Sequence, residues 1–106
     1  MLLDREEKLD EAIQYMRELE PVLELALTSE AEAEYKNEIS FADAMDKTTA
    51  GNDQKRKADA LLTTRRELEA YLKARSVSKM IQIKMKNAQT AVSAYQSLLG
   101  SERSRI

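Results

Sequence analysis

The sequence predicts an all-α protein, a long antiparallel helical hairpin or coiled coil, on the strength of three observations. About 34% of the 106 residues are charged, Trp is absent, and the apolar content consists mainly of Leu, Ala, Ile, Val and Met, which is typical of long amphipathic helices. Only one proline and two glycines interrupt the chain. Apolar residues recur at helical spacings through most of its length. We therefore expect a single helical domain over residues 1–106.

The first predicted element is an acidic helical arm over residues 4–47. Acidic residues fill its first turns, where they complement the positive end of a helix dipole. Its apolar positions are Leu9, Ile13, Met16 and Leu19, followed by Leu23, Leu27, Ala31, Tyr35, Ile39 and Ala42. Pro21 lies between these groups and lacks a backbone N–H, so we expect a kink or short break there. Ser29 and Glu32 also fit a capping box, which leaves a helix restart at Ser29 as an alternative.

A turn over residues 48–52 is predicted to separate two helical arms. Gly51 is the first glycine of the chain, and a glycine can adopt the left-handed conformation that ends a helix. The side chain of Asn52 can accept a hydrogen bond from the free N–H groups that begin the next helix. The stretch therefore indicates a helix end followed by a helix start.

The second predicted element is a basic helical arm over residues 53–99, and its apolar face changes direction partway along. In the first half the apolar residues on one side are Ala58, Leu61, Leu62, Leu68 and Leu72. In the second half they span nearly half the circumference, centred more than about 100° away. Either the helix breaks near Ser76, or one continuous helix packs against two partners.

Two further features concern the end of this arm. The apolar residues between Val77 and Met85 also alternate, so a short strand is an alternative there. Gly100 is predicted to end the helix, which leaves a flexible tail over residues 100–106.

The wide apolar face of the second arm is predicted to be an oligomer or partner interface. Its residues are Val77, Met80, Ile81, Met85, Ala88, Val92, Tyr95 and Leu99. One partner helix does not cover a face of this width, and exposed apolar patches usually mark interfaces. We expect a homo-oligomeric helical bundle. The alternative is that breaks at Pro21 and near Ser76 let four shorter helices fold into a monomeric bundle.

Charge divides the chain at the predicted turn. Residues 1–47 hold 14 acids and 5 bases, a balance of −9, whereas residues 48–106 hold 5 acids and 12 bases, a balance of +7. One interpretation is that the two arms pair side by side through opposite charges. The other is that the basic arm contacts the phosphates of single-stranded DNA. The residues assigned to that contact are Lys55, Arg56, Lys57, Arg65, Arg66 and Lys73.

The composition also argues against several function classes. There is no Cys and no His, and the serines have no neighbouring base, so we expect no enzyme activity, no metal site, no cofactor and no small-molecule substrate. The apolar runs are far shorter than the roughly 20 residues of a membrane span, and the first residues show no signal-peptide pattern. These features predict a soluble, cytoplasmic protein without a membrane partner.

Two segments of the second arm carry a resemblance to a known group. They are the run Gly51–Ala58, Gly-Asn-Asp-Gln-Lys-Arg-Lys-Ala, and the run Ser93–Leu99, which ends in Leu-Leu. This half of the chain resembles small all-helical proteins encoded by bacterial phages and prophages, in which a similar turn, a basic helix start and a Ser-x-x-x-Leu-Leu element occur. Pro21 and the run Arg75–Ser78 depart from the plain two-helix pattern of that group.

The resemblance implies a function that the residues alone do not show. Genes of that group often neighbour phage recombination functions, which implies an accessory role in DNA recombination or replication, at single strands or with recombination proteins, in the cytoplasm of a bacterial host. A second hypothesis is a protein-binding scaffold, chaperone or inhibitor of a host factor that acts through the apolar face over residues 77–99.

Overall fold

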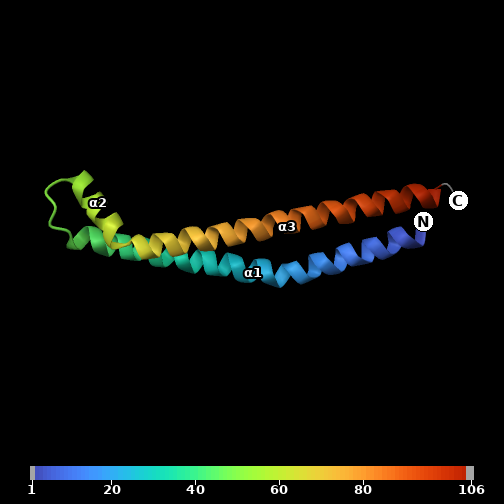
Figure 1. Ribbon diagram of the computed structural model, residues 1–106, viewed down its shortest axis with the longest axis horizontal. Helices are drawn as coiled ribbons and strands as arrows, with labels where there is room; N and C mark the ends of the chain where they lie inside the picture. Colours follow the sequence, from blue (N-terminus) through green and yellow to red (C-terminus); the bar gives the residue numbers. More distant parts are fainter. Residues whose placement is uncertain (1, 105–106) are drawn as a thin grey trace. The chain divides into compact units, whose positions relative to one another are not determined.

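The computed structural model describes residues 2–104, with side chains from Asp4 onward, and this part of the chain is helical (Figure 1). The helices are α1 (Leu2–Lys47), α2 (Asp53–Thr63) and α3 (Arg65–Ser104). No strand occurs among the described residues, so the alternating run within the second arm is helical. The predicted all-α fold class is confirmed. None of the helices over residues 2–104 is long and apolar enough to cross a membrane.

The helices form two compact units, and each unit contains part of α1 and part of α3. Unit 1 contains the described residues 2–25 and 79–104, and unit 2 contains Ala26–Ser78, including α2. Within unit 1, Arg5 near the start of α1 pairs with Glu102 near the end of α3. Within unit 2, Glu30 of α1 accepts a hydrogen bond from Ser78 of α3. Each unit is therefore an antiparallel helix pair, as the predicted hairpin requires (Figure 1).

Residues that face the partner helix recur along both helices at alternating spacings of four and three, and we call these positions the seam. On α1 the seam residues are Arg5, Leu9, Ala12, Met16, Leu19, Leu23, Ala26, Glu30, Ala33, Asn37, Ser40 and Ala44, each buried or half-buried. On α3 they are Glu67, Tyr71, Ala74, Ser78, Ile81, Met85, Ala88, Val92, Tyr95, Leu99 and Glu102, again each buried or half-buried. This spacing is the heptad pattern of coiled coils.

The seam of unit 1 is mainly apolar. Leu19, Met85 and Ala88 form a buried cluster, against which Met16 and Leu23 pack. Ile81, Val92 and Leu99 are also buried in this unit. At the end of this seam, Arg5 pairs with Glu102, and Arg103 pairs with Glu6 at 3.2 Å. Ion pairs between α1 and α3 therefore lie next to the last apolar residues of the seam.

The seam of unit 2 contains small and polar residues instead. The buried apolar residues of unit 2 are Ala26, Ala44 and Ala60, and its buried polar residues are Thr64 and Ser78; of these, Ala26, Ala44 and Ser78 belong to the seam. Ser78 is fully buried, and its hydroxyl lies 3.0 Å from the Glu30 carboxylate and 3.1 Å from the backbone oxygen of Arg75. Its single proton can be donated to either acceptor.

The apolar stripes that the sequence predicted within unit 2 lie outside the seam. On α1, Leu27, Tyr35 and Ile39 are exposed, as are Ala31 and Ala42. Of the predicted stripe on the second arm, Ala58, Leu61, Leu62 and Leu72 are exposed and Leu68 is half-buried. The contact between the helices of unit 2 uses alanine and polar residues instead, which hydrophobicity alone does not mark.

Neither of the two suspected breaks occurs. Pro21 lies inside α1, and Ser76 lies inside α3. Pro21 is exposed, so water can reach the backbone carbonyl that its missing N–H leaves without a helical partner. The alternative restart at Ser29 and the alternative of four shorter helices separated at these two points are therefore not observed.

The second arm breaks instead at Thr64, between α2 and α3. Thr64 has φ −103° and ψ 20°, and both its N–H and its hydroxyl donate to the backbone oxygen of Ala60, at 3.0 and 2.8 Å. The hydroxyl of Thr63 donates to the backbone oxygen of Asp59 at 3.0 Å. Two successive β-branched residues that bond back to carbonyls four positions earlier bend helices, which explains a break that the apolar pattern did not predict.

The turn over residues 48–52 lies where the sequence placed it, between Lys47 and Asp53. Asn52 is extended and its side chain accepts a hydrogen bond from the Lys55 N–H at 2.9 Å, so the predicted N-cap is confirmed. The expected role of Gly51 was wrong, because no described glycine has a positive φ. Gly100 likewise does not end the helix, since α3 continues to Ser104, so residues 100–104 of the predicted tail are helical and residues 105–106 lie outside the described residues.

Candidate interaction surfaces

The basic side chains of α2 and the first turns of α3 are exposed, with one exception. Lys55, Arg66 and Lys73 make no ion pair within 4.0 Å among residues 2–104. Lys57 pairs with Asp53 at 3.3 Å, and Arg65 pairs with Glu69 at 2.9 Å. Both pairs are four residues apart on one helix, so neither joins the basic arm to the acidic arm.

Arg56 is the exception among the six residues assigned to phosphate contact. It is half-buried, and its guanidinium donates a hydrogen bond of 2.9 Å to the backbone oxygen of Met45. Met45 is in the last turn of α1, where carbonyl groups have no helical partner and a cation complements the helix dipole. The Nε of Arg56 is buried without a hydrogen-bond partner. Arg56 therefore joins α2 to the end of α1, and this hydrogen bond uses part of its guanidinium.

The expected pairing of the two arms by opposite charges is not found in unit 2. The ion pairs of this unit are Lys47–Asp43, Lys57–Asp53 and Arg65–Glu69, all within one helix. The Lys47–Asp43 pair has a distance of 2.8 Å, and its hydrogen bond and charge raise the pKa of Lys47 above its ordinary value. The exposed bases of unit 2 thus remain largely uncompensated by direct contacts, which is the main electrostatic feature of this surface.

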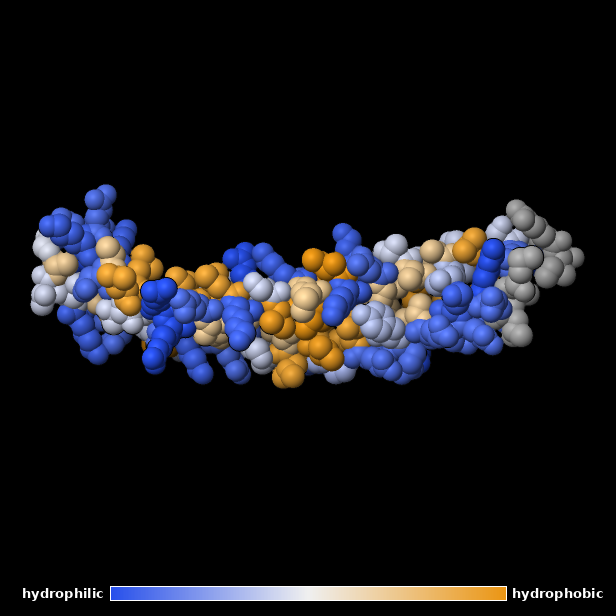
Figure 2. Space-filling view, in the orientation of Figure 1, coloured by the Kyte–Doolittle hydropathy of each residue, from blue (hydrophilic) through white to orange (hydrophobic). Residues whose placement is uncertain are grey.

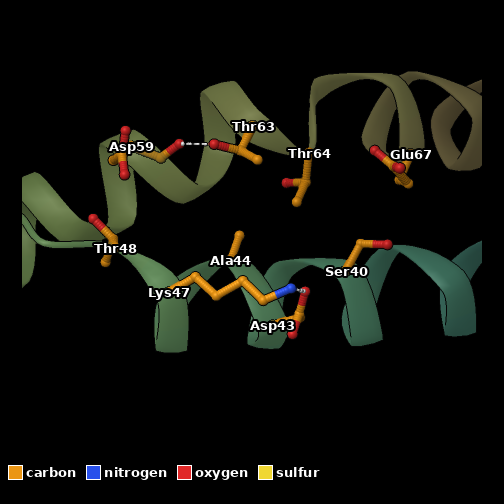
Figure 3. A pocket seen from close by; sticks show the side chains of 9 residues that line it. All are labelled: Ser40, Asp43, Ala44, Lys47, Thr48, Asp59, Thr63, Thr64 and Glu67. Carbon is orange, nitrogen blue, oxygen red and sulfur yellow. Dashed lines mark hydrogen bonds and ion pairs between the residues drawn. The ribbon is translucent and has the colours of Figure 1, made fainter.

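A polar cleft of about 360 Å³ lies in unit 2 between α1 and the α2–α3 junction (Figure 3). Figure 3 shows Ser40, Asp43 and Lys47 on one side of it and Thr63, Thr64 and Glu67 on the other. The Lys47 amine is held by Asp43, and the Thr63 and Thr64 hydroxyls donate to their own helix. No paired nucleophile and base lies in the cleft, and residues 2–104 contain no group of three or more potential ligands that could hold a metal ion.

The predicted oligomer interface of the second arm is split by the structure. Five of its residues, Ile81, Met85, Ala88, Val92 and Leu99, are buried within unit 1, and Tyr95 is half-buried there. Val77 and Met80 remain exposed, with 41% and 51% of their surface accessible. The buried five pack inside a single chain, so a partner cannot reach them while unit 1 is folded.

Exposed large apolar side chains occur in both units. In unit 2 they are Leu27, Tyr35, Ile39, Leu61, Leu62, Leu72 and Val77, of which the sequence assigned only Val77 to an interface, and in unit 1 they are Tyr15, Val22, Leu25, Met80, Ile83 and Leu98. Figure 2 shows apolar surface, coloured orange, over the part of unit 2 next to α2. The heptad spacing of Leu9, Met16 and Leu23 could have revealed this arrangement, because its continuation falls on Glu30, Asn37 and Ala44.

Two surfaces of unit 2 therefore remain as candidates for function, the exposed bases and the exposed apolar residues. The bases include Lys55, Arg66 and Lys73, and the apolar set includes Tyr35 and Ile39. Comparisons of the chain with protein-family models, with curated proteins and with solved structures found no match.

Proposed function

We propose that this protein is a non-catalytic helical accessory protein that binds single-stranded nucleic acid through the exposed bases of unit 2. The observation that carries the proposal is that Lys55, Arg66 and Lys73 make no ion pair with the acidic arm among the described residues. Unpaired cations on one surface attract phosphates and release counterions on binding. The resemblance to phage-encoded helical proteins extends the proposal to DNA recombination or replication.

The six bases assigned from the sequence have different roles in this proposal. Lys55, Arg66 and Lys73 make the phosphate contacts, because their ammonium and guanidinium groups are exposed and have no ion pair. Lys57 and Arg65 are exposed but share their charge with Asp53 and Glu69. The half-buried Arg56 supports the surface from beneath by holding α2 on α1. Tyr71 is half-buried in the seam, so base stacking is not part of the proposal.

Binding of a labelled single-stranded oligonucleotide across a salt series tests the proposal. For single strands, each phosphate contact contributes about 0.7 to the slope of log affinity against log salt, so an Arg66→Gln/Lys73→Gln variant should lose about 1.4 from that slope. The matched control is Lys8→Gln/Arg17→Gln, which removes two exposed bases from α1 and changes net charge equally.

The outcomes separate a phosphate-binding surface from general attraction. The control variant should keep the wild-type slope. Equal loss of slope in both double variants, or no binding by the wild-type protein even at low salt, would contradict the proposal. Circular dichroism of both variants checks that helix content is unchanged, as expected for exposed side chains.

A protein-binding scaffold, chaperone or inhibitor is the second candidate function, and one observation favours it. Unit 2 exposes large apolar residues, among them Leu62 with 74% and Tyr35 with 64% of their surface accessible. Exposed apolar residues that gather on one part of a protein commonly mark protein contacts. This candidate now concerns unit 2 and not the face over residues 77–99, most of which packs within the chain.

A further inference from the structure

We infer that a second copy of this chain covers the outer face of α1 in unit 2 with the flank of its own α3. The first surface is a stripe on α1, formed by Ala31, Tyr35, Ile39 and Ala42, which we call the α1 stripe. All of its residues are exposed, and Tyr35 and Ile39 retain 64% and 50% of their accessible surface. At about 100° per residue, these residues lie opposite the seam.

Acidic residues border the α1 stripe. Glu34 and Glu38 lie beside it on one edge and Glu32 beside it on the other, and all three are exposed. None of them makes an ion pair within 4.0 Å among residues 2–104. An occupant of the stripe must therefore offer apolar side chains bordered by positive charge, because burying like charges opposite these carboxylates costs binding free energy.

The chain itself carries a surface of that description, on one flank of α3 in unit 2. Leu68 and Leu72 lie four residues apart, with Arg65 seven residues before Leu72 and Arg75 seven residues after Leu68, so the four share one side of the helix. We call this surface the α3 flank. Leu72 retains 47% of its accessible surface, Leu68 is half-buried, and both arginines are exposed. Arg65 shares its charge with Glu69 at 2.9 Å, whereas Arg75 makes no ion pair within 4.0 Å among the described residues, so Arg75 carries most of the positive charge at this border.

The α1 stripe and the α3 flank cannot contact each other within one chain. Their helices meet at the seam, through Glu30 and Ser78, and the stripe lies on the side of α1 that faces away from it. When each copy uses its stripe on one neighbour and its flank on another, the contact is heterologous, and each added copy offers a free stripe and a free flank again. Such contacts continue until they close a ring or form a filament.

This assembly leaves the bases that the nucleic-acid proposal needs accessible. Arg66 and Lys73 follow Arg65 and Leu72 by one residue, which places them about 100° further around α3. A row of copies therefore presents a row of Arg66 and Lys73 side chains. The assembly itself requires no nucleic acid, so it can be tested in its absence.

Molar mass in solution over a protein concentration series provides the first test. We expect the wild-type chain to form species heavier than the 12.1 kDa monomer. Replacing both Tyr35→Gln and Ile39→Gln should raise the concentration needed for assembly by at least about tenfold, as truncation of central apolar contacts typically does. The matched control is Met80→Gln/Ile83→Gln, which changes two equally exposed residues of α3 outside both surfaces, with 51% and 61% accessible surface.

Charge reversal tests which surfaces meet. A Glu34→Arg/Glu38→Arg variant and an Arg65→Glu/Arg75→Glu variant should each assemble poorly alone, because the reversed charges repel the natural partner surface. Mixed in equal amounts they should assemble again, since each variant then supplies the charge that the other needs. Circular dichroism identifies any charge-reversal variant that has lost helix content. For such a variant, glutamine at the same two positions is used in place of the reversed charges.

Three results would overturn the inference. They are a monomeric wild-type chain at every concentration, equal weakening by the Tyr35/Ile39 and Met80/Ile83 replacements, and failure of the mixed charge-reversal variants to assemble. Loss of oligonucleotide binding with assembly intact would instead contradict only the proposed function.

Discussion

Unit 1 and unit 2 use the same antiparallel pair of helices but bury different residues between them. Unit 1 encloses Leu19, Ile81, Met85, Val92 and Leu99, whereas the buried apolar residues of unit 2 are all alanine. Hydrophobic stabilisation is about 25 cal/mol per Å² of apolar surface removed from water, so an alanine seam contributes much less. Packing within the chain therefore stabilises unit 1 more than unit 2, where the large apolar side chains Leu62 and Tyr35 remain exposed.

The ion pairs of the two units differ in the same way. In unit 1, Arg5 with Glu102 and Glu6 with Arg103 join α1 to α3. In unit 2 the pairs lie within single helices, and the contacts between helices are the Glu30–Ser78 and Arg56–Met45 hydrogen bonds. Exposed pairs of either kind contribute only about 0–1 kcal/mol each, so the seam residues decide the difference in stability.

The largest expected effect comes from removing a leucine of the unit 1 seam. Leu19 is 8% exposed and belongs to the buried cluster, so Leu19→Ala should lower the free energy of unfolding by about 2–4 kcal/mol. Leu62 of unit 2 is 74% exposed, so Leu62→Ala should change it by less than about 0.5 kcal/mol. Urea unfolding followed by circular dichroism measures both, and similar losses would show that the units do not differ as described.

An intermediate effect is expected when the seam of unit 2 is made more like that of unit 1. Ser78→Ala alone removes the buried hydroxyl that donates to Glu30 and should cost about 1 kcal/mol. Adding Glu30→Leu replaces the half-buried carboxylate with an apolar side chain and should recover at least that amount. The same unfolding measurement decides, and a double variant less stable than Ser78→Ala would show that the polar seam stabilises unit 2.

The smallest effect concerns the local ion pair at the end of α1. The Asp43 carboxylate raises the pKa of Lys47, so their contribution to stability is present below the ordinary lysine pKa and is lost as pH rises through the folded-state pKa. In Asp43→Asn, an NMR titration should show the pKa of Lys47 lowered toward its ordinary value. The unfolding curves of variant and wild type should barely differ at neutral pH. A large difference there would contradict the small contribution expected of an exposed ion pair.

The sequence was sufficient for the fold class, the turn and the N-cap, because each depends on local chemistry. Continuous helix over most of the chain follows from composition and spacing, and Asn52 caps α2 through its own side chain. Helix α1 continues through Pro21, so a continuous helix there was a better interpretation than a restart at Ser29, since a long helix tolerates a single exposed proline. Thr63 and Thr64 carried the true break, through back-bonds to carbonyls that the apolar pattern does not reveal.

The candidate site was harder to predict because the two units bury different residue types. Large apolar residues form the seam of unit 1, whereas the seam of unit 2 buries small and polar residues. In unit 1, Ile81, Met85 and Val92, which were predicted to form an oligomer or partner interface, are buried within the chain. In unit 2 the apolar positions Tyr35 and Ile39 of the predicted first arm are exposed. Only the heptad register, carried forward from unit 1, distinguishes the two.

Hydrogen exchange of backbone amides tests the contrast between the units most directly, because it reports local opening along the chain. The measurement compares the wild-type protein with the Tyr35→Gln/Ile39→Gln variant at a concentration where the wild type is assembled. We predict that amides of unit 2 exchange faster in the variant while those of Ile81–Leu99 in unit 1 keep their protection. Equal protection of unit 2 in both proteins would contradict the proposal that another copy covers the α1 stripe.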